Sequence, residues 1–245
     1  GKRLPYKISK VDWDLELAKK AGYEHFMLKE IFEQPNAIEN TMFGRIKDGE
    51  VVFDKKIEHL ISKGSLRDIK NIVIVSCGTA YHAGLVGEYL IEKFAKIHVG
   101  VDLSSEFRYR DPGVDEGTLM IVISQSGETA DSLAALRLAR KKGARILSIC
   151  NVVGSSIARE SDAVIYTQAG PGIAVASTKA YTSQLTSLVL LCIYLGRLNN
   201  RLSRKGARSL LNELKRIPSL IKGFLNDKNN QKTIDECVKK YHNTK

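Results

Sequence analysis

Residues 120–130, MIVISQSGETA, join an apolar β-branched run to a small polar turn and the first residue of a helical pattern. The run does not alternate with polar residues, which is typical of a strand covered on both faces. Strands of this kind belong to parallel sheets with helices on each side. A similar pattern, IVIVSCGTA, occupies residues 72–80. The sequence therefore predicts an α/β protein in which strand, turn and helix repeat along the chain.

Further short apolar runs extend the predicted sheet, at residues 97–101, 145–149 and 163–166. Helical patterns span residues 81–96 and 130–142, and Gly143 follows the second where a helix C-cap is expected. Right-handed β-α-β crossovers join neighbouring parallel strands. We expect a three-layer α-β-α fold with a parallel sheet, of the flavodoxin-like or Rossmann-like kind.

Helical patterns also flank the predicted sheet. Residues 12–42 indicate an amphipathic helical arm interrupted at Pro35, and residues 177–198 indicate a long helix that is apolar nearly all round and therefore buried. Residues 203–241 indicate two helices, broken around Pro218 and residues 226–230.

These patterns divide the chain into three expected parts. They are a helical arm and linker at residues 1–48, the α/β domain at residues 49–200, and C-terminal helices at residues 201–245.

Composition restricts the class of protein. The chain has 245 residues, of which 43% are hydrophobic and 27% charged, which excludes a disordered or low-complexity chain. The net charge of +11 favours anionic ligands. Lysine and arginine are nevertheless dispersed without an aromatic-basic motif, so we expect no nucleic-acid partner. The most apolar run, residues 185–195, is too short to cross a bilayer, so we expect no membrane partner.

Cysteine spacing bears on metal sites and on the compartment. The four cysteines show no CxxC or Cys/His ligand spacing; they are Cys77, Cys150, Cys192 and Cys237. We therefore expect no disulfide framework, no metal site and a reducing compartment, the cytoplasm. No GxGxxG or GxxxxGK[ST] segment occurs, which argues against a nucleotide cofactor, and we expect no cofactor.

Residues 124–129, which we call the serine turn, carry the strongest chemical signal. Ser124, Gln125 and Ser126 follow a buried strand, and Thr129 precedes a helix. The first N–H groups of a helix lack intrahelical partners, and together with the helix dipole they favour a bound phosphate. The alternative is that Ser124 or Ser126 only caps the helix. We favour an anion site, because one cap does not require several polar side chains.

Residues 77–79, the cysteine turn, follow the same logic with fewer donors. Gly78 permits close backbone approach and Thr79 offers a hydroxyl, so helix capping and ligand contact are equally open. Cys77 fits a small buried residue better than a reactive thiol. His82 fits a helix-face residue better than a general base.

Residues 170–178, the Gly-Pro loop, precede the long helix. Ser177 or Thr178 is expected to cap that helix, and Ser177 could also meet the sugar end of a ligand. Lys179 either neutralises a phosphate or is a solvated surface charge.

Several of these motifs together resemble a sugar isomerase (SIS) domain. They are SQSGETAD (124–131), CGT (77–79), SEFRY (105–109), CNV (150–152) with GSS (154–156), and VASTKA (175–180). More narrowly, they resemble the first of two SIS domains in the isomerising glutamine-fructose-6-phosphate aminotransferases, or glucosamine-6-phosphate synthases. HFMLKEI (25–31) with EQP (33–35) is similar to the segment that enters the isomerase half of that family, so the resemblance covers nearly the whole chain.

The resemblance implies a set of sugar-phosphate ligands. They are Ser124, Gln125, Ser126 and Thr129 for the phosphate, with Cys77, Gly78, Thr79, Val175 and Ser177 around the sugar. Two positions depart from the family pattern. Ala80 stands where the family often has a phosphate-binding Ser, and Gly172 stands where it often has Glu.

The family enzyme makes glucosamine 6-phosphate from fructose 6-phosphate and glutamine. By resemblance, its glutaminase domain supplies ammonia and its second SIS domain supplies the catalytic Glu, His and Lys. We therefore expect this chain to bind fructose 6-phosphate or glucosamine 6-phosphate in a homodimer, to hold no catalytic residue itself and to be inactive alone. The alternative is a stand-alone or regulatory SIS protein that binds a sugar phosphate.

Overall fold

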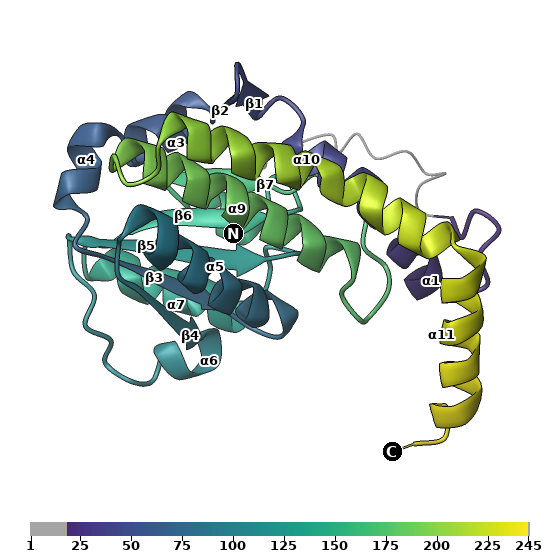
Figure 1. Cartoon of the computed structure of the whole chain (residues 1–245). Coiled ribbons are helices and arrows are strands. Elements are labelled where there is room, and N and C mark those ends of the chain that lie inside the picture. The colour runs from purple at the N-terminus through teal and green to yellow at the C-terminus, as the bar shows by residue number, and fades with distance from the viewer. Residues whose placement is uncertain (1–18, 245) are drawn as a thin grey trace.

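Figure 1 shows a computed structural model of the chain, which describes residues 19–244, with residues 63–65 described in their backbone only. A five-stranded parallel sheet runs through its centre in the order β4-β3-β5-β6-β7. The strands are β3 (Asn71–Ser76), β4 (Val99–Leu103), β5 (Thr118–Ser124), β6 (Arg145–Cys150) and β7 (Ala163–Tyr166). The predicted parallel sheet is confirmed, and every residue of β5 is buried, as its uninterrupted apolar run indicates.

The strand order determines where a ligand can bind. β3 pairs with β4 on one side and with β5 on the other, so the chain reverses its direction across the sheet between β3 and β5. This order is that of flavodoxin-like folds, which bind ligands outside the carboxyl ends of the strands at such a switch point. Ser76 pairs with Ile123, so β3 and β5 end side by side. The cysteine turn and the serine turn therefore start next to each other.

Helices cover both faces of the sheet (Figure 1). One face packs against α5 (Thr79–Ala95) and α9 (Lys179–Leu198), which also pack on each other. The other face packs against α6 (Ser104–Phe107), α7 (Ala130–Lys141) and α8 (Ser156–Arg159). Within β5, Ile121 and Ile123 face the first core and Met120 and Val122 the second. The predicted three-layer α-β-α fold is confirmed.

The N-terminal arm is shorter than its sequence pattern indicates. Residues 12–18 lie outside the described part, and residues 19–25 form turns and bends rather than helix. The arm consists of α1 (Phe26–Phe32) and α2 (Gln34–Met42). Pro35 lies in the first turn of α2, where its missing N–H has no helical partner to lose. The prediction of helix from residue 12 is therefore wrong for residues 19–25, where Ala21 and Gly22 both have positive φ.

The linker that follows contains elements that periodicity does not indicate. β1 (Ile46–Lys47) and β2 (Glu50–Val51) pair antiparallel around Asp48 and Gly49, both with positive φ. Asp-Gly is a favoured pair for such a two-residue turn. Two short helices, α3 (Lys55–Leu60) and α4 (Lys63–Asp68), lead into β3.

The C-terminal part consists of α10 (Arg204–Asn226) and α11 (Lys228–Tyr241). The expected break near residues 226–230 is confirmed: Asp227 caps α11 by accepting hydrogen bonds from the amides of Asn229 and Asn230. The expected break at Pro218 is wrong, because α10 continues through it. Pro218 belongs to the buried stripe of α10, and packing of this stripe holds both halves of the helix in line despite the lost hydrogen bond.

α10 packs on α2 and α9, whereas α11 extends away from the body of the molecule and buries none of its side chains (Figure 1). Over residues 19–244, no helix is both long and apolar enough to span a membrane.

Candidate functional site

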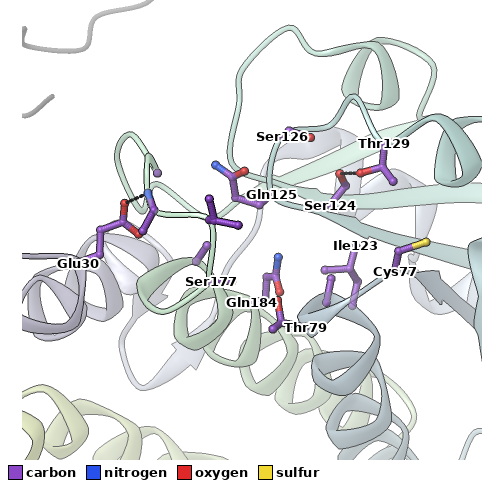
Figure 2. A pocket seen from close by; sticks show the side chains of 15 residues that line it. Glu30, Cys77, Thr79, Ile123, Ser124, Gln125, Ser126, Thr129, Ser177 and Gln184 are labelled. Atoms are coloured by element: carbon purple, nitrogen blue, oxygen red, sulfur yellow. Dashed lines mark hydrogen bonds between the residues drawn. The ribbon is translucent and has the colours of Figure 1, made fainter. Parts of the chain in front are cut away.

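A cavity of about 200 Å³ opens at the carboxyl edge of the sheet, where β3 and β5 end. Figure 2 shows the side chains that converge on it from the serine turn, the cysteine turn, the Gly-Pro loop, α1 and α9. Among its lining residues are eight of the predicted ligands: Cys77, Thr79, Ser124, Gln125, Ser126, Thr129, Val175 and Ser177. Gly78 does not line it; this residue is the exposed N-cap of α5.

The serine turn is shaped by its own hydroxyl groups. Ser124 Oγ accepts a hydrogen bond from the Gly127 amide at 3.0 Å, and Ser126 Oγ accepts one from the Glu128 amide at 3.2 Å. Gly127 has φ +66°, and a Cβ there would lie 1.9 Å from Ser155 Oγ, so only glycine fits. The two serines thus fold the turn but do not cap α7, whose N-cap residue, Thr129, makes no side-chain capping bond. The alternative, in which one of these serines only caps the helix, is therefore wrong.

The turn keeps protons free for a ligand. A hydroxyl has one proton to donate and two lone pairs. Ser126 Oγ uses a lone pair for Glu128, so its proton can go to a phosphate oxygen. Ser124 Oγ and Thr129 Oγ1 lie 3.0 Å apart, and whichever of them donates to the other, its partner keeps a free proton. Together with the uncapped N-terminus of α7, the turn offers several converging neutral donors to an anion.

A carboxylate beside the turn fixes its far side. Glu128 Oε1 accepts the Ser156 amide at 2.7 Å at the start of α8. This bond lowers the pKa of Glu128, which is exposed. The serine turn is therefore held to both α7 and α8.

The cysteine turn contributes a backbone that few other sequences can adopt. Gly78 has φ 61° and ψ −139°, a region that glycine almost alone occupies. Cys77 is half-buried and lines the cavity, so the prediction of a small buried residue is wrong. His82 is exposed and does not line the cavity; its ring packs edge-on against Tyr81.

The Gly-Pro loop is held at its first residue and near its middle by residues from distant elements. Asn151, at the end of β6, donates from Nδ2 to the Gly170 carbonyl at 2.7 Å. Glu30, on α1, accepts the amides of Ile173 and Ala174 on Oε1 at 2.7 and 2.9 Å. The helical arm therefore determines where Val175 and Ser177 lie.

Two predictions for the start of α9 are wrong. Thr178 is its N-cap, but neither the Thr178 nor the Ser177 hydroxyl makes a capping bond, and both are buried with no hydrogen-bond partner in the described part of the chain. Lys179 is neither solvated nor directed at the cavity: it is 3% exposed and donates to Glu33 Oε2 at 2.7 Å. Because the Lys179 ammonium group is buried away from water, its charge is stabilised by pairing with the Glu33 carboxylate.

Ala80 and Gly172, which depart from the family pattern, both line the cavity. Ala80 places a methyl group where a hydroxyl would face the ligand. A Cβ at Gly172 would lie 3.1 Å from Gln125 Nε2, so a larger residue there would displace the Gln125 side chain. The sequence did not indicate Glu30 or Gln184, which also line the cavity, because nothing local connects them with the turns.

The charge and metal-binding capacity of the side chains near the cavity restrict how it could hold an anion. Of the described residues that line the cavity, none is lysine or arginine, so an anion there would rely on hydroxyls, amides and the helix dipole. The described residues contain no group of three His, Cys, Asp or Glu side chains arranged to hold a metal.

Burial raises the pKa of Cys150 to about 11 and that of Cys192 to about 12, so both thiols are protonated at neutral pH.

Comparison with known proteins agrees with this geometry. The sequence profile described as the SIS domain matches residues 65–194. The chain belongs to the SIS domain family. The profile ends within α9, so it covers the whole central sheet and all three turns that form the cavity.

The chain is also similar to isomerising glutamine-fructose-6-phosphate aminotransferases. That of Caldanaerobacter subterraneus is 50% identical over 246 residues, covering 100% of this chain and 40% of the relative. That of Clostridium tetani is 54% identical over 219 residues, covering 89% of this chain and 36% of the relative. The chain therefore spans well under half the length of these relatives.

Solved structures show the same relationship. The C-terminal domain of glucosamine-fructose-6-phosphate aminotransferase from Francisella tularensis superposes with a TM-score of 0.82 at 43% identity, over 90% of this chain and 61% of that one. The tagatose-6-phosphate ketose/aldose isomerase from Escherichia coli, at 15% identity and a TM-score of 0.62, shares the fold over 84% of this chain and 56% of its own. The resemblance of the sequence to the first SIS domain of the aminotransferases is confirmed.

Proposed function

We propose that this SIS domain binds the sugar phosphate in an isomerising glutamine-fructose-6-phosphate aminotransferase. The observation that carries the proposal is the convergence of free hydroxyl protons and the N-terminus of α7 on one cavity at the switch point of the sheet. A phosphate would bind Ser124, Ser126 and Thr129, with Gln125 beside them. The sugar would extend toward Thr79, Val175 and Ser177.

The proposed role explains why a binding domain matters for an isomerisation. The reaction opens the sugar ring of fructose 6-phosphate, forms an imine with ammonia from glutamine, and moves a proton between C1 and C2. Fixing the distant phosphate places these two carbons against the base, so binding energy far from the reacting atoms supports the rate. In this proposal the chain contributes the phosphate site and the sugar contacts.

The other contributions come from outside the described site. We propose that a glutaminase domain supplies ammonia and that a second SIS domain supplies the proton-transferring groups, in a cytoplasmic homodimer. We also propose that the arm and linker (1–48), the α/β domain (49–200) and the C-terminal helices (201–245) are distinct parts of this half. The chain alone is then a binding domain without turnover.

Calorimetric titration tests the binding proposal directly. Fructose 6-phosphate, glucose 6-phosphate and inorganic phosphate are each titrated into the chain, into Ser126→Ala, and into Ser219→Ala, which removes an exposed hydroxyl on α10. We expect saturable hexose-phosphate binding that weakens about 10-fold or more in Ser126→Ala, because a hydrogen bond to a charged group is lost. Ser219→Ala should bind like the parent chain.

Two results would contradict the proposal. One is no binding of either hexose phosphate by the parent chain. The other is hexose-phosphate binding no tighter than that of inorganic phosphate, which would indicate general attraction of anions to a chain of net charge +11.

A further inference from the structure

Gln184 is an unusual residue for the interior of this protein. It lies in α9, is 2% exposed, and its Oε1 has no hydrogen-bond partner among the described residues. Buried polar atoms are nearly always paired, because an unpaired one costs free energy relative to its hydrated state. An amide retained in this position therefore requires a reason.

The position of Gln184 supplies that reason. Ser177, Ala180 and Gln184 all line the cavity, and their spacing of three and four residues places them on one face of the chain entering α9. Figure 2 shows the Gln184 side chain projecting into the cavity, with the Ser124–Thr129 pair across from it. Ser177 Oγ is buried without a partner as well. Two unpaired polar atoms thus lie on the α9 side of the cavity, away from the serine turn.

The chemistry of an amide narrows the ligand group that can satisfy it. The Gln184 amide accepts on Oε1 and donates two hydrogens from Nε2, so it is the unpaired Oε1 that needs a donor such as a hydroxyl. The serine turn already provides donors for a phosphate, which itself has no hydrogen to give when fully ionised. The group that pairs with Gln184 Oε1 is therefore a hydroxyl on the part of the ligand remote from the phosphate.

We propose that Gln184 is a specificity-determining residue that accepts a hydrogen bond from a sugar hydroxyl of the bound hexose phosphate. The inference rests on the proposed function and adds to it a residue that discriminates a polyhydroxylated ligand from a bare phosphate. In the free protein the amide oxygen is unpaired, and the sugar hydroxyl pairs it when the ligand binds. A phosphate that lacks this hydroxyl leaves the oxygen unpaired and therefore binds with lower affinity.

The test replaces the amide with an apolar side chain of similar length. Gln184→Met is titrated with fructose 6-phosphate and inorganic phosphate, beside Ser126→Ala and the matched control Gln231→Met on the exposed surface of α11. We expect Gln184→Met to weaken fructose 6-phosphate binding about 5- to 10-fold and to leave phosphate binding unchanged. Ser126→Ala should weaken both ligands, and Gln231→Met neither.

Thermal unfolding of the ligand-free proteins separates recognition from structure. If Gln184 is retained for the ligand, Gln184→Met removes an unpaired buried oxygen, and the midpoint should hold or rise by about 2–4 °C. A fall in the midpoint together with weaker binding would show a structural role and overturn the proposal.

Deoxy analogues identify the hydroxyl that is read. The parent chain should bind one deoxyhexose 6-phosphate more weakly than the full sugar phosphate. Gln184→Met should bind that analogue and the full sugar phosphate equally well, because the variant has already lost the bond that the missing hydroxyl makes. Equal fructose 6-phosphate affinity of Gln184→Met and the parent chain would overturn the inference alone. Failure of the parent chain to bind any hexose phosphate would overturn the proposed function and this inference with it.

Discussion

Removal of the Glu30 carboxylate tests whether the helical arm holds the Gly-Pro loop in its binding position. Glu30 is 5% exposed and accepts the amides of Ile173 and Ala174 at 2.7 and 2.9 Å. Through these bonds Glu30 joins α1 to the loop segment that carries Val175. In Glu30→Ala, both amides lose a charged acceptor and the loop loses its attachment to the arm.

The magnitude follows from the two bonds. A hydrogen bond to a charged group contributes roughly 1.5–3 kcal/mol, so the lower value gives about 3 kcal/mol for the pair. Ile173 is exposed and Ala174 half-buried, so water can replace part of what is lost. We therefore assign about 1.5 kcal/mol to the attachment, which is roughly a tenfold change in the ratio of attached to released loop.

Hydrogen exchange measures this change at the loop itself. The amides of Ile173 and Ala174 should exchange up to about tenfold faster in Glu30→Ala. Fructose 6-phosphate affinity should fall by about 2- to 10-fold, since only the attached fraction presents Val175 and Ser177. Inorganic phosphate should bind as before, because none of the hydrogen bonds that shape the serine turn involves Glu30.

Two further variants make the result specific. Glu39→Ala removes an exposed carboxylate from α2 and should change neither exchange nor affinity. Glu30→Gln keeps an oxygen acceptor without the charge and should give an intermediate effect. Unchanged exchange at both amides in Glu30→Ala would refute the reasoning, since the bonds would then not be holding the loop.

The remaining predictions concern the turns around the cavity. Cys77 is half-buried in the cavity and should be alkylated by iodoacetamide at pH 8, with protection by fructose 6-phosphate read by mass spectrometry; equal labelling with and without ligand would place the ligand elsewhere. Cys150 should stay unlabelled, because burial raises its pKa to about 11. Urea unfolding should show a loss of about 2–4 kcal/mol for Gly127→Ala, where positive φ adds to a 1.9 Å clash with a side chain, and about 1 kcal/mol for Gly78→Ala, which has open space around it; similar losses would show that the clash is relieved. Ala80→Ser should tighten fructose 6-phosphate binding about 3- to 10-fold in calorimetry by adding a hydroxyl to the cavity, and no change would mean that position 80 does not reach the ligand.

The sheet could be predicted from the sequence because its strands are buried on both faces. A run such as residues 119–123 has no solvent-facing position, so its apolar character alone marks it, and β5 extends only one residue beyond it at each end. Amphipathic helices are less well marked at their ends. The pattern of residues 12–42 continues through residues 19–25, where backbone turns rather than side-chain polarity end the helical conformation.

Local rules for proline and for capping residues gave wrong predictions at two helices. A proline predicts a break from local chemistry alone, but Pro218 lies in a stripe that packs against the body of the protein. Tertiary packing therefore outweighs the loss of one backbone bond there. At the start of α9 the local rule also fails, since Ser177 and Thr178 leave their hydroxyls unpaired. Of these two residues only Ser177 lines the cavity, and its unpaired hydroxyl fits a group retained for a ligand.

Some residues of the candidate site have a local sequence signal and others do not. Each of the three turns carries its signal within a few residues, so the serine turn, the cysteine turn and the Gly-Pro loop could each be recognised separately. Their meeting point depends on strand order, which puts the ends of β3 and β5 side by side although 47 residues separate paired Ser76 and Ile123 along the chain. Glu30 and Gln184 could not be recognised, because the partner of each is brought near only by the complete fold. Glu30 acts on a loop 143 residues away, and Gln184 Oε1 has no hydrogen-bond partner among the described residues. Residues whose chemistry is completed by a distant part of the chain, or by a ligand, leave no local pattern in the sequence.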